Sequence, residues 1–199
     1  MKNIFKILIV AAMVFPFACN KQNFKELAEI PPMKYALERD HRKMIDRGDI
    51  ASHFSMQRGF NWVTIKVPKD VQIALFDSRY REVDYYWWLK FNKWFDELKF
   101  ENGVMPIDQK QNMDCDNFAL LYKSLMGVSG YKSGDPDEPA VAVMFVQQRN
   151  AWGGIPEGGL HMVNLVFTLE GWFVYEPQTG KRILLENYPN AGYVQYIIL

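Results

Sequence analysis

Cys115, His161 and Glu176 are the residues of this chain whose side chains could together carry out nucleophilic catalysis. A cysteine thiolate attacks carbonyl carbons, and a histidine can take the thiol proton and later protonate the leaving group. A carboxylate that accepts a hydrogen bond from the imidazole orients the ring and stabilises the imidazolium. We therefore expect a thiol hydrolase acting on peptide or isopeptide bonds. With an amine in place of water as the acceptor, the same residues would catalyse acyl transfer.

The surroundings of Cys115 both favour and oppose a thiolate. We expect Cys115 to begin a helix directly after a capping residue, Asp114 or Asn112. The free N–H groups of a helix N-terminus favour an anion and could contribute to an oxyanion hole. The carboxylates of Asp114 and Asp116 act in the opposite direction. A cation bound between them would remove this penalty.

The N-terminus predicts export. Lys2 and Lys6 give a positive start, residues 7–17 are an apolar run, and Ala18 precedes Cys19. This is the pattern of a secretory signal, and a cysteine at its end is typical of a lipoprotein. The alternative is an ordinary cleaved signal with an incidental cysteine.

The domain prediction follows from this N-terminus. Residues 1–19 form the lipoprotein signal peptide, 20–32 a tether and 33–199 a single domain held at a membrane, in the periplasm or on the cell surface. Lipidation of Cys19 leaves Cys115 as an unpaired thiol in an oxidising compartment, which indicates a reactive residue. The alternative for Cys115 is a buried, inert thiol.

The composition predicts a folded domain without a nucleic-acid partner. Apolar residues make up 49% of the 199 residues, which is enough for a substantial core. Lys and Arg total 23, as do Asp and Glu, so the net charge is zero and nothing indicates a polyanionic partner.

The hydrophobic pattern predicts helices followed by an antiparallel sheet, which is an α+β fold. Helices are expected over residues 33–47, 79–99 and 114–126, the last ending at Gly127. Strands are expected over residues 60–67, 140–147, 160–168, 172–176, 182–185 and 193–198. An apolar stripe on the second helix is expected to be core: Tyr85, Trp88, Phe91, Phe95 and Leu98.

The two strands that carry His161 and Glu176 are expected to form a hairpin. One register places His161 opposite Glu176, and a tight turn at residues 170–171 instead places Gln178 opposite Val163. Both registers put His161, Glu176 and Gln178 on one face of the sheet. Either Glu176 or Gln178 could therefore orient the imidazole, and the chemistry favours Glu176.

Three short motifs resemble the papain-like C-terminal domain of a mushroom agglutinin family, which also occurs in bacterial and phage proteins. They are Asp114-Cys115-Asp116-Asn117-Phe118-Ala119, then His161-x-x-Asn164, then Tyr175-Glu176-Pro177-Gln178-Thr179. The resemblance covers roughly residues 75–199 and implies a papain-like cysteine protease fold with a Cys115, His161 and Glu176 triad. More distantly, the chain resembles transglutaminase-like peptidases, which usually have Asp where this chain has Glu176.

The resemblance also implies a calcium ion beside the active site. Its candidate ligands here are Asp114, Asp116 and Gln178, with Asn164 as a weaker one. Papain-like enzymes have a glutamine upstream of the cysteine that binds the oxyanion, and Gln109 and Gln111 are the weak candidates for it. No sugar-binding repeat precedes the domain, so lectin activity is not implied.

A different class of function is a non-catalytic envelope lipoprotein that binds a protein or glycan partner, for example as an exclusion factor. Trp87, Trp94 and Trp152 would then be contact residues. Such a binder would still work with Cys115→Ser, whereas a thiol hydrolase would not. The glycine-rich segment 152–159 could shape a substrate cleft, move as a lid, or simply connect two strands.

Overall fold

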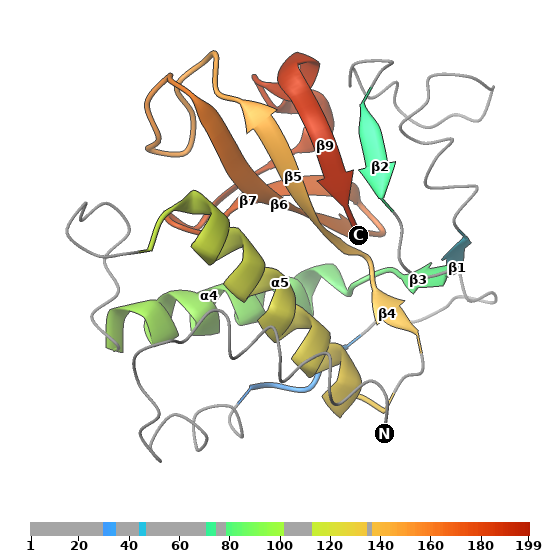
Figure 1. Ribbon diagram of the computed structural model, residues 1–199. Coiled ribbons are helices and arrows are strands. Elements are labelled where there is room, and N and C mark those ends of the chain that lie inside the picture. Colours follow the sequence, from blue (N-terminus) through green and yellow to red (C-terminus); the bar gives the residue numbers. More distant parts are fainter. Residues whose placement is uncertain (1–29, 35–43, 47–70, 75–78, 102–112, 135–136) are drawn as a thin grey trace.

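The computed structural model describes residues 30–34, 44–46, 71–74, 79–101, 113–134 and 137–199, with backbone only for 44–46 and Arg79. Helices and a mostly antiparallel sheet are combined in an α+β fold, as the sequence predicts (Figure 1). The elements are β1 (Met44–Asp46), β2 (Gln72–Ala74), β3 (Arg79–Arg81), α4 (Tyr85–Glu101), α5 (Cys115–Lys132), β4 (Glu138–Pro139), β5 (Val141–Gln147), β6 (Leu160–Thr168), β7 (Gly171–Glu176), β8 (Lys181–Leu184) and β9 (Val194–Ile198), with 3-10 turns η1 (Leu185–Asn187) and η2 (Ala191–Tyr193).

The main sheet has six strands in the order β2-β9-β5-β6-β7-β8. Neighbouring strands in this sheet are antiparallel, except for β2 and β9, which are parallel. A smaller sheet has the order β1-β3-β4. The strands that carry His161 and Glu176, β6 and β7, are therefore neighbours within the larger sheet.

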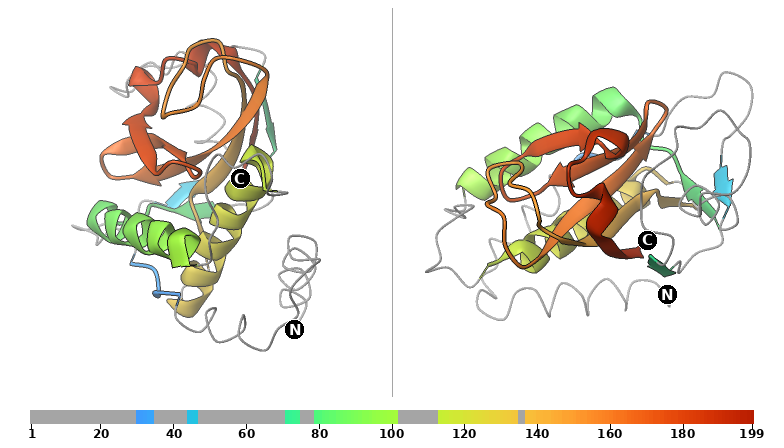
Figure 2. Two further views of the ribbon diagram at one scale, coloured as in Figure 1. Left: turned by 90° about the vertical axis from the view of Figure 1, so that its left-hand side faces the viewer. Right: turned by 90° about the horizontal axis from the view of Figure 1, so that it is seen from above.

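Helices α4 and α5 lie against one side of the main sheet, and Figure 2 shows this from two further directions. The core between them includes Trp88 and Phe95 from α4, Tyr122 from α5, and Val166 and Tyr175 from the sheet. All five of these side chains are 0% exposed. Burial of each such large side chain contributes about 1.5–3 kcal/mol to the stability of the fold. This layer therefore holds both helices on the sheet.

A second core lies on the other face of the sheet. It contains alternate residues of the strands, such as Val163 and Leu165 of β6 and Val174 of β7, and it is closed by Leu185 and Tyr188. Because side chains alternate along a strand, His161 shares its face with Val163 and Leu165, and Glu176 shares its face with Val174.

Helix α4 begins six residues later than the sequence analysis predicts. Asp84 caps it, because the Asp84 carboxylate accepts a hydrogen bond from the Trp87 N–H at 2.7 Å. The preceding residues 79–81 form β3, which pairs with β1 and β4. Pairing with strands distant in sequence therefore overrides the helical periodicity of this segment.

Helix α5 does not end at Gly127, as expected, but continues to Lys132. A glycine inside a helix costs about 1 kcal/mol relative to alanine. Met126 and Ser129, on either side of Gly127, are fully buried. The packing of this last part of the helix outweighs that cost.

Residues 30–34 pack against the C-terminal part of α5 as a short strap. The Met33 N–H donates to the Ser129 carbonyl at 3.0 Å, and Lys132 donates to the Ile30 carbonyl at 2.7 Å. Ile30 is 1% exposed, and the Ser129 hydroxyl donates to the Pro31 carbonyl. The last residues of the predicted tether thus belong to the folded core.

The other predicted elements have mixed outcomes. The strand over Leu160–Thr168 has the expected bounds, and those over 140–147, 172–176, 182–185 and 193–198 are each displaced by one residue at one or both ends. The end of the expected helix 33–47 is wrong, because Met44–Asp46 form β1 and pair with β3. The expected strand 60–67 lies outside the described residues. Among the described helices, none is long and apolar enough to cross a membrane.

Candidate functional site

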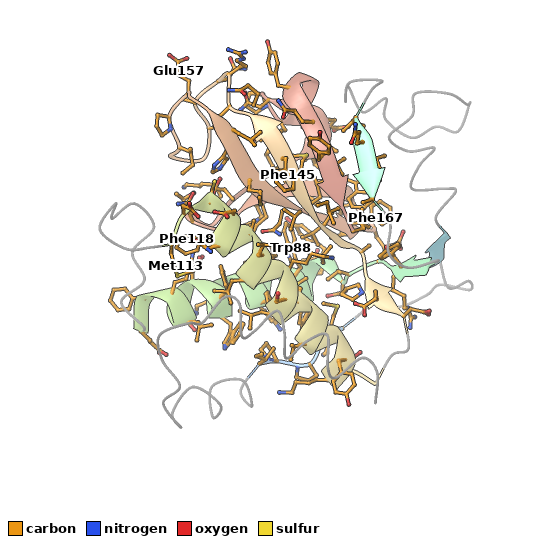
Figure 3. The ribbon with its side chains drawn as sticks, in the orientation of Figure 1. Trp88, Met113, Phe118, Phe145, Glu157 and Phe167 are labelled. Atoms are coloured by element: carbon orange, nitrogen blue, oxygen red, sulfur yellow. The ribbon has the colours of Figure 1, made fainter. Side chains whose placement is uncertain are left out.

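Cys115 is the first residue of α5 and is half-buried. The Asn117 side chain accepts a hydrogen bond from the Asp114 N–H at 3.3 Å, which helps to fix the start of the helix. One turn further on, Asn164 of β6 donates to the Ala119 carbonyl at 2.9 Å. This bond ties the N-terminal part of α5 to β6, the strand that carries His161. Figure 3 labels Met113 and Phe118, which lie on either side of Cys115 in the sequence, at this end of the helix.

The β6–β7 hairpin has a register between the two that the sequence analysis considered. Asn164 faces Tyr175 and Thr168 faces Gly171, so Leu169 and Glu170 form the turn. The Thr168 hydroxyl accepts a hydrogen bond from the Glu170 N–H at 3.2 Å, which stabilises this tight connection. Both expected registers are wrong, because each pairs a residue of β6 with a residue two positions away from its actual partner. A shift of two positions preserves the alternation of side chains, so the expected face is correct.

His161 and Glu176 form a short, buried hydrogen bond. His161 Nε2 and Glu176 Oε2 are 2.5 Å apart, and the residues are 6% and 0% exposed. Since a carboxylate oxygen can only accept, the hydrogen belongs to Nε2, and Nδ1 is the ring nitrogen left for the thiol. The Cys115 side chain interacts with His161 and helps to raise the pKa of the imidazole. The three residues therefore form one connected chain from thiol to carboxylate.

The pKa of His161 reflects this arrangement. Burial lowers the pKa of the imidazole, but the hydrogen bonds and charges of Cys115 and Glu176 act more strongly in the other direction. Together they raise the pKa of His161 from 6.5 to about 9. The site thus favours an imidazolium between an acceptor carboxylate and the sulfur atom.

The turn after β7 holds the second oxygen of Glu176. Glu176 Oε1 accepts a hydrogen bond from the Gln178 N–H at 3.0 Å. The Gly180 N–H donates to the Glu176 carbonyl at 2.8 Å, and Gly180 has a φ of +74°. Both carboxylate oxygens therefore have donors, which offsets the cost of burying the charge.

The glycine-rich segment 152–159 is attached to the rest of the structure rather than free to act as a lid. The Thr179 hydroxyl donates to the Gly153 carbonyl, and Trp152 packs edge-on against Tyr188 with centroids 5.0 Å apart. At its far end the Gly158 N–H donates to the Gln148 carbonyl at 2.8 Å. These contacts favour a fixed wall over a lid, and Figure 3 labels Glu157 in this segment.

Asp114 and Asp116 are the two candidate metal ligands that lie close to each other. A hydrogen bond with Asp114 raises the pKa of Asp116, and burial and the Asp114 charge add to this effect. Two carboxylates this close suit an oxygen-binding cation such as Ca²⁺. Within the described part of the chain, however, no three His, Cys, Asp or Glu side chains form a metal-binding group.

The two amide candidates have other partners. The Asn164 amide donates to the carbonyls of Ala119 and Ala142, at 2.9 and 3.3 Å, while its buried oxygen has no hydrogen-bond partner. Gln178 donates its backbone N–H to Glu176, and its carbonyl accepts from Lys99. Asn164 thus links helix and strand, and the Gln178 backbone is held in the turn by Glu176 and Lys99.

Several other candidates can be placed only in part. Gln109, Gln111 and Cys19 lie outside the described residues. Trp87, expected as an exposed contact residue, is 7% exposed because it packs on Phe91, with ring centroids 5.2 Å apart. Trp94 and Trp152 are half-buried, so none of the three indoles is fully exposed.

Lys99 is a residue near the site that the sequence analysis does not single out. It lies four residues after Phe95, on the buried stripe of α4, and is only 7% exposed. Its ammonium group contacts the turn after Glu176. A charged residue at a position where the helical period predicts an apolar one is the signal that could have identified it.

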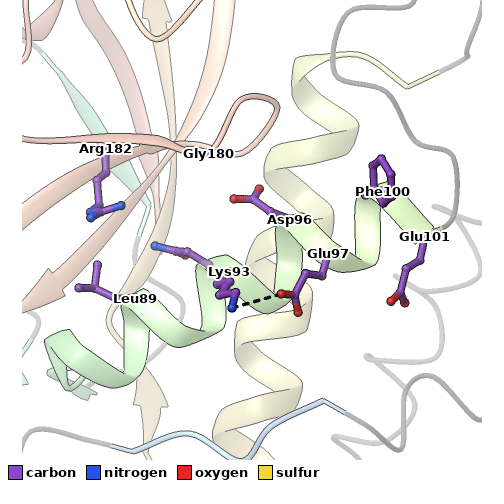
Figure 4. A pocket seen from close by; sticks show the side chains of 9 residues that line it. Leu89, Lys93, Asp96, Glu97, Phe100, Glu101, Gly180 and Arg182 are labelled. Atoms are coloured by element: carbon purple, nitrogen blue, oxygen red, sulfur yellow. Dashed lines mark ion pairs between the residues drawn. The ribbon is translucent and has the colours of Figure 1, made fainter.

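A cavity of about 470 Å³ lies between α4 and the turn after β7, with Asp96, Gly180 and Arg182 in its wall (Figure 4). Neither Cys115 nor His161 lines it. The Cys115, His161 and Glu176 side chains are thus connected by their own contacts, away from this cavity.

No protein-family model matches the chain, and no curated protein matches it. Among solved structures, the chain is similar to the one titled "PSL1a-E64 complex", with a TM-score of 0.53 and 13% sequence identity. The match covers 78% of this chain and 50% of the other, so this chain spans about half the length of that protein. At this identity the likeness concerns the fold alone.

Proposed function

We propose that this protein is a thiol hydrolase that cleaves peptide or isopeptide bonds, with a papain-like variant of the α+β fold. The observation that carries the proposal is the connected chain from Cys115 through His161 to the buried Glu176, with a 2.5 Å bond between the last two. A nucleophile, a base and a group that orients the base are the parts that acyl transfer requires.

In the proposed first half-reaction, the Cys115 sulfur bonds to the substrate carbonyl carbon while His161 holds the proton from the thiol. The backbone N–H of Cys115, at the first position of α5, stabilises the oxyanion. The tetrahedral intermediate then collapses to a thioester as the C–N bond breaks. His161 gives its proton to the leaving amine.

In the second half-reaction His161 removes a proton from water, and the resulting hydroxide attacks the thioester. Collapse releases the carboxylic acid, and the proton returns to the thiolate. Glu176 keeps the ring in one tautomer and stabilises each imidazolium state without taking the proton. Its complete burial makes this interaction stronger than it would be in water.

Export as a lipoprotein and calcium dependence are parts of the proposal that rest on other observations. Lipidation of Cys19 would explain why a cysteine ends the N-terminal signal sequence. It would also leave Cys115 as the one other cysteine of the sequence. Asp114 and Asp116 would hold the calcium ion, which would offset two negative charges beside the sulfur. The similar fold solved as a complex with E64 makes E64 the first small molecule to test on Cys115.

The test is the rate at which an alkylating agent modifies Cys115 across the pH range. The Cys19→Ser chain should be used, because Cys115 is then its one thiol. We expect alkylation well below the pKa of a free thiol, about 8.5, and a slower reaction in His161→Ala. Mass spectrometry after incubation with E64 would show whether a covalent adduct forms on Cys115.

Cys115→Ser is the matched control, since it should react neither with the alkylating agent nor with E64. Reaction only above about pH 8.5, with no effect of His161→Ala, would overturn the enzyme proposal. A Cys115→Ser protein that still performs the biological role would instead support a binding lipoprotein.

A further inference from the structure

The ammonium group of Lys99 lies in the last turn of α4 and has three acceptors. Asp96 Oδ1 is 2.7 Å away, the Pro177 carbonyl 2.6 Å and the Gln178 carbonyl 3.2 Å. A lysine ammonium has three hydrogens, so each can be directed to one oxygen. The Phe95 ring, whose centroid is 5.0 Å from Nζ, closes a further side.

Two of these acceptors belong to the turn that follows Glu176. The Pro177 carbonyl and the Gln178 N–H are the two ends of one peptide group, which is planar and trans, so they point in opposite directions. The carbonyl end accepts from Lys99, and the N–H end donates to Glu176 Oε1 at 3.0 Å. Lys99 therefore fixes and polarises the peptide group that holds the Glu176 carboxylate.

Asp96 supports the same turn from the same helix. A Cβ atom placed on Gly180 would lie 2.7 Å from Asp96 Oδ2, so the carboxylate occupies the space that any other residue would need. Figure 4 shows the Asp96 side chain directed from α4 towards the turn at Gly180. Helix α4 thus contacts the turn after Glu176 through both charges of one ion pair.

Burial of a lysine is costly unless its charge is compensated, and an apolar residue would pack at this position without that cost. The three polar contacts of Lys99 are therefore best explained by what they hold. We propose that Lys99 is a positioning residue that, together with Asp96, keeps Glu176 in place to orient His161. This inference rests on the proposed function, because it concerns the same catalytic site.

The test compares Lys99→Met with Lys93→Met in the Cys19→Ser chain. Both variants remove one positive charge from α4, but the Lys93 side chain is 80% exposed and pairs with Glu97 of the same helix. The first measurement is the proton resonance of His161 Nε2–H, which lies at low field when the hydrogen is held by a carboxylate. The second is the rate of Cys115 alkylation at a fixed, near-neutral pH.

We expect Lys99→Met to shift or lose the Nε2–H resonance and to slow alkylation on the order of tenfold, as is typical when a supporting partner is removed. Lys93→Met should resemble the parent chain in both measurements. Lys99→Arg should restore part of both signals, because the guanidinium can still donate to the two carbonyls. A merely structural lysine would change thermal stability but leave the resonance in place.

An unchanged resonance and rate in folded Lys99→Met would overturn the role of Lys99. If Lys99→Met does not fold, Asp96→Asn is the deciding variant. Asp96 is half-exposed, and its substitution leaves the two contacts between Lys99 and the carbonyls in place. We then expect a smaller shift of the Nε2–H resonance, in the same direction. No shift in that variant would also overturn the inference. The enzyme proposal fails separately, if His161→Ala does not slow alkylation in the parent chain.

Discussion

Gly153 lies directly over Glu176: a Cβ atom on Gly153 would be 3.4 Å from Cγ of Glu176 and 3.5 Å from its Cβ. The backbone of the glycine-rich segment thus covers the aliphatic part of the carboxylate residue. This contact excludes water from one side of the bond between Glu176 and His161.

Gly153→Ala should weaken the site. Gly153 has a φ of +66°, which strains any other residue, so we expect a loss of about 1–2 kcal/mol in the free energy of unfolding. The displaced segment should also admit water to Glu176 and slow Cys115 alkylation. Urea unfolding and the alkylation rate measure the two effects.

Gly158→Ala is the matched control in the same segment. A Cβ atom there would meet nothing within 4 Å, and Gly158 does not have a positive φ. Equal effects of the two substitutions would show that the contact with Glu176 is not important.

The stability of the protein should depend on pH through His161. The pKa of His161 is raised from 6.5 to about 9, so the imidazolium stabilises the folded state. This contribution is complete below about pH 6.5 and is lost as the pH rises through about 9. A rise of this size corresponds to about 3 kcal/mol.

Urea unfolding of the parent chain and of His161→Gln, at about pH 6 and about pH 10, measures this contribution. The difference in unfolding free energy between the two proteins should be larger at the lower pH. A difference that does not change with pH would contradict the thiol, imidazole and carboxylate arrangement.

Calcium should stabilise the protein and accelerate alkylation of Cys115. A hydrogen bond with Asp114 raises the pKa of the Asp116 carboxyl, and burial and the Asp114 charge add to this effect. A cation would satisfy both carboxylates. At a concentration 100 times its dissociation constant, it would stabilise the folded state by about 2.7 kcal/mol.

Thermal unfolding with calcium and with a chelator, in the parent chain and in Asp116→Asn, tests this prediction. The calcium response should disappear in Asp116→Asn and persist in Glu97→Gln, which removes an exposed carboxylate from α4 instead. If calcium and chelator give the same unfolding temperature in the parent chain, the calcium proposal is wrong.

The sequence is sufficient to predict the α+β class and most strands of the sheet. It also predicts that His161 and Glu176 share one face of the β6–β7 hairpin, because alternation along a strand depends only on residue spacing. The register itself depends on the turn, and the Thr168 hydroxyl that fixes a two-residue turn has no distinctive local pattern.

Long-range contacts explain what the sequence does not predict. The start of α4 depends on β3 pairing with β1, and the continuation of α5 past Gly127 depends on the buried Ser129 and its contacts with the strap. Lys99 contacts carbonyls 78 and 79 residues further along the chain. No local periodicity contains such information, although a lysine on an apolar stripe is a reason to look for a partner.

The strap at residues 30–34 contacts the end of α5 that is far from Cys115. It is bound at Ser129 and Lys132, near the end of α5, whereas Cys115 is the first residue of that 18-residue helix. At 1.5 Å per residue the two ends are about 27 Å apart. Ile30, the first described residue of the strap, is therefore held at the end of α5 opposite the Cys115 sulfur.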